Sequence, residues 1–272
     1  MNKIEYRGLS FEIPLVGTAG TTLFPQLPEV YHLENPSLIC SDTNSIWDLK
    51  KFETESRIPI IAGQVADKKL FSQRCDLRIL DMPVKFPGSH EYRIPNELMQ
   101  FIPTMQACID HYTLLNPLST ECFAYVTVDQ GPVKCGQTQR NPGCHVDGFQ
   151  GARIFPKVPI NQSYICCDSA PTVFYPHRFQ VSDLDPAVDD FFAEFDRQAV
   201  ESKAWHTDPY NLVLMDAYCV HRSQLSTEPG IRTFFRLTFE RRIFDRLGNT
   251  HNPMFDYSWE MVARDVHSTL RK

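Results

Sequence analysis

The segment Ile231–Glu240 constrains the fold of this chain more than any other stretch of its sequence. Its residues alternate with a period of two, as in a β-strand. One face of that strand would carry Arg232, Phe234, Arg236 and Thr238. Two guanidinium groups on an inward face are costly to bury unless they meet an anion. Because an arginine binds a carboxylate through two parallel hydrogen bonds, the segment favours a β-structure that encloses a dicarboxylate.

A second short segment brings an imidazole and a carboxylate together. His145 and Asp147 are two residues apart, so they would point from the same face of a strand, while Val146 points away. A third metal ligand is offered by His221, near the end of the apolar, strand-like run Leu212–Arg222. Two imidazoles and one carboxylate, with the remaining positions open, suit non-haem Fe(II) and oxygen chemistry.

Together these residues resemble the pattern of the Fe(II)- and 2-oxoglutarate-dependent dioxygenase superfamily, in which H-x-D is followed by a distal His and then by Arg. Arg232 lies eleven and Arg236 fifteen residues beyond His221, a spacing similar to that of the taurine-dioxygenase-like branch. Thr172 stands at the distance from H-x-D at which that branch has a Thr that contacts the cosubstrate. The resemblance covers residues 128–239.

The resemblance implies a fold and a cosubstrate site. The fold would be mostly β with flanking helices, a double-stranded β-helix or cupin-like jelly roll. Residues 1–272 would form a single domain, with about 1–95 and 241–272 as elaborations. Arg232 would hold the distal carboxylate of 2-oxoglutarate, Arg236 would help neutralise its C1 carboxylate, and Thr172 would donate a hydrogen bond.

The resemblance also implies a reaction. Fe(II), 2-oxoglutarate and O₂ would be used together, with release of succinate and CO₂ and oxidation of a substrate. Asp147 is the carboxylate that related halogenases lack, so hydroxylation is the expected outcome. Desaturation and ring formation start from the same hydrogen abstraction and remain open.

Two alternative ligand sets have to be weighed against this triad. His206, after Trp205, competes with His221, but only His221 precedes the paired arginines at the spacing of the family. Cys135 and Cys144 with His145 could bind zinc, although the sequence contains no C-x-x-C pair. We therefore expect His145, Asp147 and His221 to bind the metal.

Composition limits the class of protein. Of 272 residues, 42% are hydrophobic and 22% charged, which is typical of a soluble globular chain. No apolar stretch approaches the ~20 residues of a membrane span, and the start lacks a signal-peptide core, so we expect a cytoplasmic protein. Nine scattered cysteines do not resemble a secreted disulfide framework. A net charge of −6 argues against non-specific binding to nucleic acid.

Basic residues gather near the end of the chain, at Arg241, Arg242, Arg246, Arg264, Arg271 and Lys272. Acidic residues such as Asp245, Glu260 and Asp265 are mixed among them. The favoured interpretation is a solvated face.

Periodicity and turn residues predict the remaining elements. Strands are expected at 11–13, 37–40, 58–61, 77–80 and 122–128. A loop is expected at 129–143, and a pair of strands follows it at 163–167 and 172–175. A helix is expected over 96–112, capped by Asn96 and kinked by Pro103, and another from the cap Asp185 to Ala199. A short helix would follow the turn-rich tail, at 259–270.

Substrate contacts are less sharply indicated. Arg153 lies eight residues beyond His145, on the metal-facing side of an unbroken strand, and could hold an anionic group. The other candidates are Gln139, Tyr125, Trp205, His251 and Asn252.

Three functions remain at this point. The favoured one is a hydroxylase of a small molecule, such as an amino acid or a specialised metabolite. The alternatives are a protein or nucleic-acid hydroxylase of the same superfamily and a non-catalytic metal-binding β-barrel.

Overall fold

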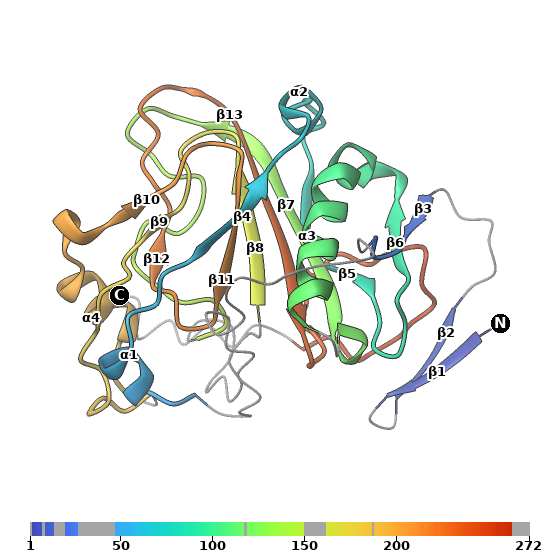
Figure 1. Cartoon of the computed structure of the whole chain (residues 1–272), viewed down its shortest axis with the longest axis horizontal. Helices are drawn as coiled ribbons and strands as arrows, with labels where there is room; N and C mark the ends of the chain where they lie inside the picture. The colour runs from blue at the N-terminus through green and yellow to red at the C-terminus, as the bar shows by residue number, and fades with distance from the viewer. Residues whose placement is uncertain are drawn as a thin grey trace.

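The computed structural model describes residues 2–6, 9–13, 20–26, 47–116, 119–149, 162–186 and 188–262. Figure 1 shows a mostly β architecture with a few helices. All named strand pairs are antiparallel. This agrees with the expectation of a mostly β protein with flanking helices, and it is consistent with a jelly-roll-like fold.

The largest sheet has six strands in the order β4-β11-β8-β13-β7-β5. Their bounds are Ile60–Gln64 (β4), Asn211–Asp216 (β11), Gln162–Cys167 (β8), Gly230–Glu240 (β13), Phe123–Val133 (β7) and Arg78–Lys85 (β5). A three-stranded sheet has the order β10-β9-β12, with bounds Trp205–His206, Val173–Phe174 and His221–Arg222. Two-stranded sheets join β1 (Asn2–Tyr6) to β2 (Leu9–Ile13) and β3 (Gly20–Leu23) to β6 (Tyr92–Pro95).

The helices are short except for one. The α-helices are α1 (Lys50–Thr54), α2 (Lys68–Phe71), α3 (Ile102–Leu115) and α4 (Phe191–Gln198), and the 3₁₀ helices are η2 (Asn96–Phe101), η3 (Ser119–Glu121) and η4 (Glu201–Lys203). Within the described ranges, none combines the length and the apolar character that a bilayer-crossing helix needs.

The predicted alternation of Ile231–Glu240 is present in β13. Phe235, Leu237 and Phe239 are fully buried in the core that α3 covers. There Phe239 stacks on Tyr112 of α3, with ring centroids 3.5 Å apart. Each large apolar side chain buried in this way contributes about 2–3 kcal/mol. This packing holds the sheet against α3 and turns the other face of β13, with Phe234, toward the smaller sheet.

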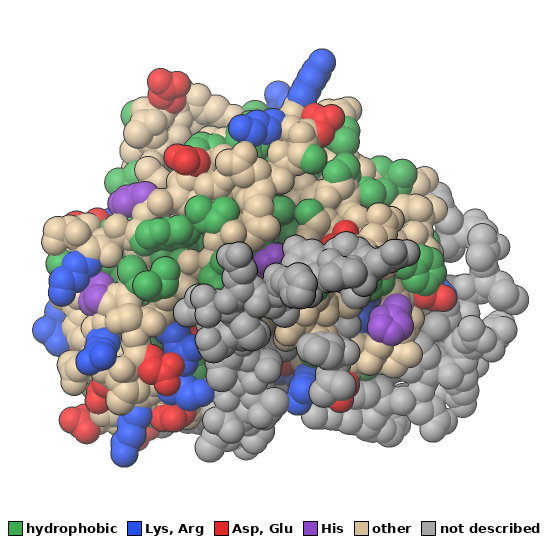
Figure 2. Space-filling view, in the orientation of Figure 1, with side chains coloured by type: hydrophobic (Ala, Val, Ile, Leu, Met, Phe, Trp, Pro, Cys, Tyr) green, Lys and Arg blue, Asp and Glu red, His purple; other side chains and the backbone are tan. Residues whose placement is uncertain are grey.

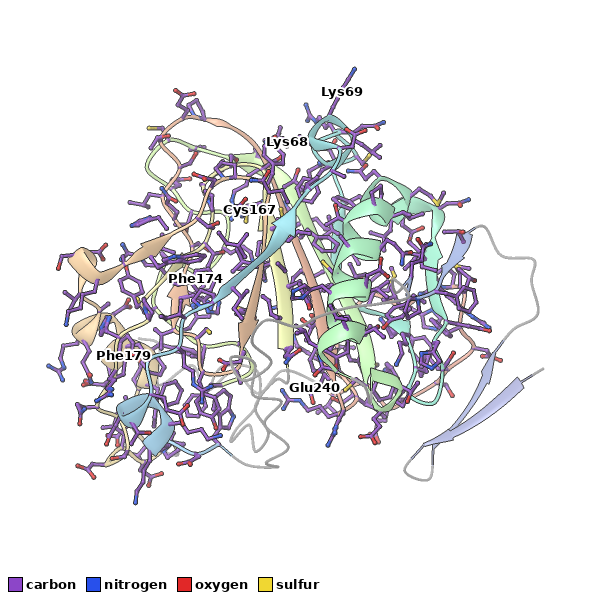
Figure 3. All side chains as sticks on the ribbon, in the orientation of Figure 1. Lys68, Lys69, Cys167, Phe174, Phe179 and Glu240 are labelled. Carbon is purple, nitrogen blue, oxygen red and sulfur yellow. The ribbon has the colours of Figure 1, made fainter. Side chains whose placement is uncertain are left out.

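A second core fixes the three-stranded sheet. Its buried residues come from β9, α1, α4 and the segments around the two histidines, and they include Phe52, Val146, Val173, Phe191, Phe195 and Val220. Between the two sheets lies a further buried group, to which Cys167 and Phe174 belong. Figure 3 labels both side chains in the interior, near β8 and β9. The two sheets are thus each anchored from outside and face one another across the interior.

Several expected elements differ from those observed. The helix expected over 96–112 is a 3₁₀ turn, η2, followed by α3, and Pro103 lies in the first turn of α3 rather than kinking its interior. A proline fits this position because the first N–H groups of a helix have no partner inside it. The helix expected from Asp185 begins only at Phe191, where the Asp190 carboxylate accepts hydrogen bonds from the N–H groups of Phe192 and Ala193.

The strands also differ in detail. Strand β7 continues to Val133 into the expected loop, because its register with β13 runs on through Gly131 and Pro132. Strands β8 and β9 were expected to pair with each other, but they belong to different sheets. The expected strand at 37–40 lies outside the described residues. Of the expected tail helix, residues 259–262 are not helical, and the rest lies outside the described ranges.

Candidate functional site

The two candidate histidine ligands face each other across a single backbone bridge. The N–H of His145 donates to the carbonyl of His221 at 2.9 Å, and the reverse hydrogen bond has the same length. Their ring centroids are 4.5 Å apart. The expected strands are incomplete here, because His145 forms only this bridge and the run from Leu212 breaks at a turn between β11 and β12. The predicted alternation nevertheless holds, since Val146 is buried in the second core, away from the histidines.

Local hydrogen bonds fix which nitrogen of each imidazole faces inward. Nδ1 of His145 lies 2.8 Å from the carbonyl of Gly143, and Nδ1 of His221 lies 2.9 Å from the carbonyl of Cys219. A carbonyl oxygen only accepts, so each Nδ1 carries the proton and each Nε2 keeps its lone pair. Burial and the neighbouring His221 imidazole lower the pKa of His145 to about 4. At neutral pH the His145 imidazole is therefore uncharged, as a metal ligand must be.

Asp147 completes the group. One ligand atom from each of His145, Asp147 and His221 can be chosen so that all lie within 4.8 Å of one another. Gly148, with φ of 78°, reverses the chain directly after Asp147. Such a backbone conformation favours glycine. Two imidazole nitrogens and one carboxylate oxygen on one side of a small cation leave other positions open, so the donors fit a non-haem Fe(II) site.

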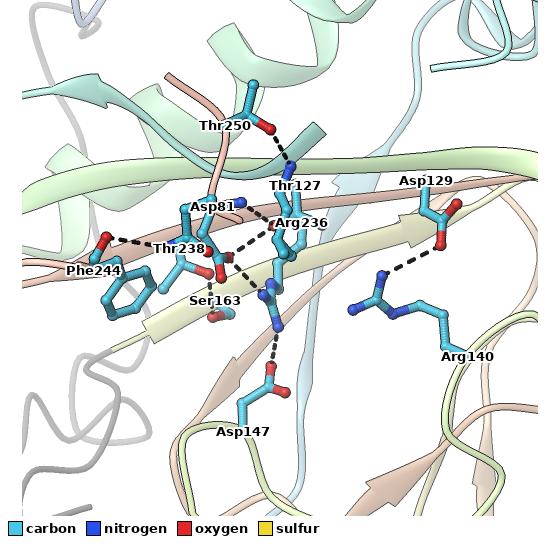
Figure 4. Close-up of polar contacts among 12 residues, drawn as sticks. Asp81, Thr127, Asp129, Arg140, Asp147, Ser163, Arg236, Thr238, Phe244 and Thr250 are labelled. Carbon is cyan, nitrogen blue, oxygen red and sulfur yellow. Dashed lines mark hydrogen bonds and ion pairs between the residues drawn. The ribbon is translucent and has the colours of Figure 1, made fainter. Parts of the chain in front are cut away.

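Arg236 and Asp81 support the Asp147 carboxylate. Nη1 of Arg236 donates to Oδ2 of Asp147 at 2.8 Å, and Nη2 donates to Oδ1 of Asp81 at 2.9 Å (Figure 4). Burial alone would raise the pKa of Asp147, but Arg236 and the two imidazoles hold it well below its ordinary value. The carboxylate is thus kept charged and pointed at the histidines.

A bulge in β5 places Asp81. The register of β5 on β7 shifts between Ile79 and Met82, and Asp81 has a positive φ of 43°. Aspartate tolerates this region better than most residues. Oγ1 of Thr127 donates to Asp81 Oδ1 at 2.9 Å and accepts from its N–H at 3.0 Å. The bulge therefore aims a buried carboxylate at Arg236 from a neighbouring strand.

A cavity of about 500 Å³ contains the three candidate ligands. Its apolar wall comes from the inner face of the large sheet, with Ile165, Met215 and Phe234. Among the described residues its charged lining is made of Asp81, Asp129, Asp147, Asp245, Arg140, Arg236, Arg242 and Arg246. A cavity of this volume is in the range of small-molecule sites.

The structure separates the predicted cosubstrate residues. Thr172 and Arg236 line the cavity, whereas Arg232 is 2% exposed and is not part of the cavity wall. Nε of Arg232 donates to the carbonyl of Ser169 at 2.9 Å, and Nη2 donates to the carbonyl of Ala170 at 3.0 Å. Nη1 donates to Oε1 of Gln139 at 2.6 Å. All three nitrogens of Arg232 are therefore engaged within the chain.

Arg140 presents a more available cation to the cavity. Its guanidinium lies 4.5 Å above the Phe234 ring, and its nearest ion pair, with Asp129, is 3.6 Å long. Figure 4 shows this side chain reaching toward Arg236 and Asp147. Burial, followed by the charge of Arg236, lowers the pKa of Arg140 from its ordinary value. Arg140 therefore places a cationic group on the cavity wall.

The predicted substrate contacts have different locations. Gln139 lines the cavity. Tyr125 is buried behind its wall, where its hydroxyl donates to the Arg242 carbonyl at 3.1 Å. Trp205 packs on Phe174 instead, with ring centroids 5.6 Å apart.

The remaining candidates do not contribute to the described lining. His251 is exposed and stacks on Tyr257, at 4.4 Å between ring centroids. Asn252 is buried and donates to the carbonyls of Pro83 and Arg93 at 2.8 and 3.0 Å. Arg153 lies outside the described residues. The competing ligand His206 is exposed on β10, and the zinc alternative finds no support among the described groups, because Cys135 is exposed and binds the Thr227 carbonyl.

Sequence reasoning missed several charged residues of the site. Asp81 left a weak signal, a single acid inside the apolar run Leu80–Val84. Arg242 and Arg246 were expected on a solvated face, but both line the cavity. The expectation fits Arg241, whose side chain is 38% exposed and pairs with Glu121 at the surface.

Comparison with known proteins adds little. The chain matches neither a protein-family model nor a curated protein. It resembles a solved structure described as an oxidoreductase of the 2OG-Fe(II) oxygenase family from Burkholderia pseudomallei, with 11% identity over 71% of this chain and 76% of that chain and a TM-score of 0.30. A TM-score of 0.30 is too low to establish a common fold.

Proposed function

We propose that the chain is an Fe(II)- and 2-oxoglutarate-dependent oxygenase that hydroxylates a small molecule, with release of succinate and CO₂. The observation that carries this proposal is the convergence of His145, Asp147 and His221 in one cavity, with both Nε2 atoms left free for a metal. Bound Fe(II) would supply the centre at which O₂ and 2-oxoglutarate react. The two antiparallel sheets around the cavity would then be the halves of a double-stranded β-helix, and the arginine spacing favours the taurine-dioxygenase-like branch.

The residues of the chain would orient and enclose the reactants. Arg236 and Asp81 would keep the Asp147 carboxylate ionised and fixed in direction. Ile165, Met215 and Phe234 form an apolar wall beside the ligands, which would limit the access of water to the reacting groups.

The distal carboxylate of 2-oxoglutarate would bind Arg140, with Thr172 beside it. Both residues line the cavity, whereas a carboxylate could reach Arg232 only by displacing Gln139 or a backbone carbonyl. Arg232 would instead hold the 169–170 turn that precedes Thr172. The sequence-based assignment to Arg232 is the alternative. If Arg140 binds the distal carboxylate, replacing Arg140 changes the KM for 2-oxoglutarate, and if Arg232 binds it, replacing Arg232 does.

A small substrate is favoured over a macromolecule. The cavity volume of about 500 Å³ suits a metabolite. On the described part of the face in Figure 2, acidic and basic side chains lie intermingled. With a net charge of −6, this surface gives no support to electrostatic binding of a nucleic acid.

The proposal is tested by measuring succinate formed from 2-oxoglutarate under air with Fe(II), with and without candidate small molecules. We expect Fe(II)-dependent succinate that is lost in His145→Ala and His221→Ala. His206→Ala is the matched control, because His206 is an exposed histidine on β10 outside the described cavity lining, and it should behave as wild type. Equal succinate in His145→Ala and wild type, or none in either, would contradict the proposal, and the second outcome favours a non-catalytic metal-binding protein.

A further inference from the structure

The segment after β13 forms one wall of the cavity. We call residues 242–249 the tail wall, and its cavity-lining members are Arg242, Ile243, Phe244, Asp245, Arg246 and Asn249. Tyr125 holds it from behind, since its hydroxyl donates to the Arg242 carbonyl and accepts from the Phe244 N–H, both at 3.1 Å. Its ring stacks on Phe244, with centroids 4.2 Å apart. The backbone of the wall is therefore fixed, and Figure 4 shows Phe244 on the same side of the sheet as Asp81.

Polar atoms without partners gather on this wall. The buried side-chain atoms that lack a hydrogen-bond partner include Nε of Arg242, Nε of Arg246 and Oδ1 of Asn249. Leaving such an atom unsatisfied in a protein interior costs about 1–3 kcal/mol. Nε of Arg242 still lies 3.7 Å from Oε2 of Glu240, so Nε of Arg246 and Oδ1 of Asn249 are the donor and the acceptor on this wall that a ligand would satisfy.

Among the residues that the structure describes, one arginine of the cavity wall has no ion pair. Arg236 lies between two carboxylates, Arg140 pairs with Asp129 at 3.6 Å, and Arg242 pairs with Glu240 at 3.7 Å. Arg246 has no ion pair with any residue that the structure describes. Asp245 lines the same wall but has partners of its own. A partly buried guanidinium with free donors is suited to bind a carboxylate or another oxyanion.

We infer that the primary substrate is an organic acid whose anionic group binds Arg246, with Arg242 beside it, and whose neighbouring N–H or O–H group donates to Oδ1 of Asn249. This assignment rests on the proposed function, because it names the substrate class of that site. The anion bound at Arg246 is the carboxylate, or a similar oxyanion, of the substrate. The distal carboxylate of 2-oxoglutarate is the other possible source of the same chemistry, and the experiment separates the two.

The first experiment needs no turnover. The full chain is loaded with Zn²⁺ and saturating 2-oxoglutarate and titrated with trifluoroacetate, a carboxylate probe followed by ¹⁹F NMR, and with trifluoroethanol as its neutral counterpart. We expect trifluoroacetate to bind and trifluoroethanol not to bind. Arg246→Met should weaken binding of trifluoroacetate roughly tenfold or more, as expected for loss of a charge-assisted pair. Arg241→Met is the matched control, since Arg241 is in the same segment but pairs with Glu121 at the surface, and it should match wild type.

Two results overturn the inference. Equal binding of trifluoroacetate to wild type and Arg246→Met excludes Arg246 as the anion site. Trifluoroacetate that binds only when 2-oxoglutarate is left out, with 2-oxoglutarate binding weakened in Arg246→Met, assigns the anion to the cosubstrate instead. If Arg246→Met folds poorly, Arg246→Lys retains the charge without the planar fork, and intermediate binding by this variant supports the inference while binding equal to that of wild type contradicts it.

The second experiment uses turnover. Candidate acids, each paired with its methyl ester, are tested for stimulation of succinate release by the Fe(II)-loaded protein. We expect stimulation by free acids and not by their esters, with the KM of the stimulating acid raised roughly tenfold or more in Arg246→Met. Stimulation by esters equal to that by acids would contradict the inference. A protein that binds trifluoroacetate through Arg246 but releases no succinate would instead contradict the proposed function.

Discussion

Arg236 donates a hydrogen bond of 2.8 Å to Oδ2 of Asp147, while Oδ1 of the same carboxylate lies 3.9 Å from Nε2 of His221. The arginine thus holds one carboxylate oxygen and leaves the other facing the histidines. Its second nitrogen is held by Asp81, so the orientation of a candidate ligand depends on a residue of another strand.

Replacing Arg236 should weaken metal binding. In Arg236→Met the Asp147 carboxylate loses its charged partner, and we expect the Kd for Fe(II) or Ni²⁺ to rise about 10–100-fold, as for other residues that orient metal ligands. Anaerobic isothermal titration measures this effect. Asp81→Asn leaves the pair with Asp147 in place, so its Kd should rise less. An unchanged Kd in Arg236→Met, with Arg241→Met as the surface control, would show that Asp147 needs no such support.

Arg140 and Arg232 should respond differently to replacement. Arg140→Met should raise the KM for 2-oxoglutarate roughly tenfold or more, because the proposed partner of the distal carboxylate is removed. Arg232→Met should instead lower the free energy of unfolding by a few kcal/mol, since the partly buried carbonyls of Ser169 and Ala170 lose the donors of a buried arginine. Steady-state kinetics and urea unfolding provide the two readouts. The opposite result would be a raised KM for 2-oxoglutarate in Arg232→Met, with normal stability, and an unchanged KM in Arg140→Met. It would show that Arg232 binds the distal carboxylate.

The two faces of β13 should separate stability from metal binding. Phe235 is fully buried against Phe101, with ring centroids 5.7 Å apart, whereas its neighbours Phe234 and Arg236 line the cavity. Phe235→Ala should lower the free energy of unfolding by about 3–5 kcal/mol. The milder Phe235→Leu should stay folded and bind metal with the Kd of wild type. Loss of metal affinity in folded Phe235→Leu would mean that the two faces are coupled.

Lys85 should make stability depend on pH. Burial lowers the pKa of Lys85 to about 8, although the neighbouring Cys122 opposes the shift. In the unfolded chain a lysine has a pKa of about 10.4, so above about pH 8 the unfolded state binds a proton at this residue that the folded state does not. The free energy of unfolding therefore rises with pH above about pH 8 because of Lys85. Below about pH 8 both states bind the proton, and Lys85 adds no pH dependence.

The variant Lys85→Met removes that contribution. The difference in the free energy of unfolding, wild type minus Lys85→Met, should increase by about 2 kcal/mol between about pH 7 and pH 9.5. Urea unfolding at both pH values measures it, and the subtraction cancels the cysteines and tyrosines that titrate in the same range. Parallel pH profiles for the two proteins would show that the pKa of Lys85 is not lowered and that the folded protein keeps this side chain charged above pH 8.

Local patterns in the sequence predicted the parts of the site that depend on neighbouring residues. The alternation of β13 separates Phe235 from Arg236, and the spacing of two residues turns His145 and Asp147 to one side. Contacts between distant segments left no such pattern. Arg236 meets Asp81 across 155 positions of sequence, and nothing near Asp81 indicates this. Arg246 lines the cavity only because the tail turns back over it, and charge mixing near Arg246 suggested solvent instead.

Turn chemistry explains the errors in the elements. Pro103 was expected to kink a long helix, but a 3₁₀ turn precedes it and converts its position into a helix start. Asp190, not Asp185, supplies the cap, because its carboxylate accepts hydrogen bonds from the N–H groups of Phe192 and Ala193. Several residues near each of these helices could start it, and tertiary packing decides which of them does.

The most direct test is an anaerobic titration of the metal-free protein with Fe(II), in wild type and in Asp147→Ala, His221→Ala and the control His206→Ala. The convergence of three side chains on one cation predicts a single Fe(II) site in wild type and in His206→Ala. In Asp147→Ala and His221→Ala the Kd for Fe(II) should rise about tenfold or more. Binding of equal strength in all four proteins would contradict the metal centre and, with it, the proposed oxygenase.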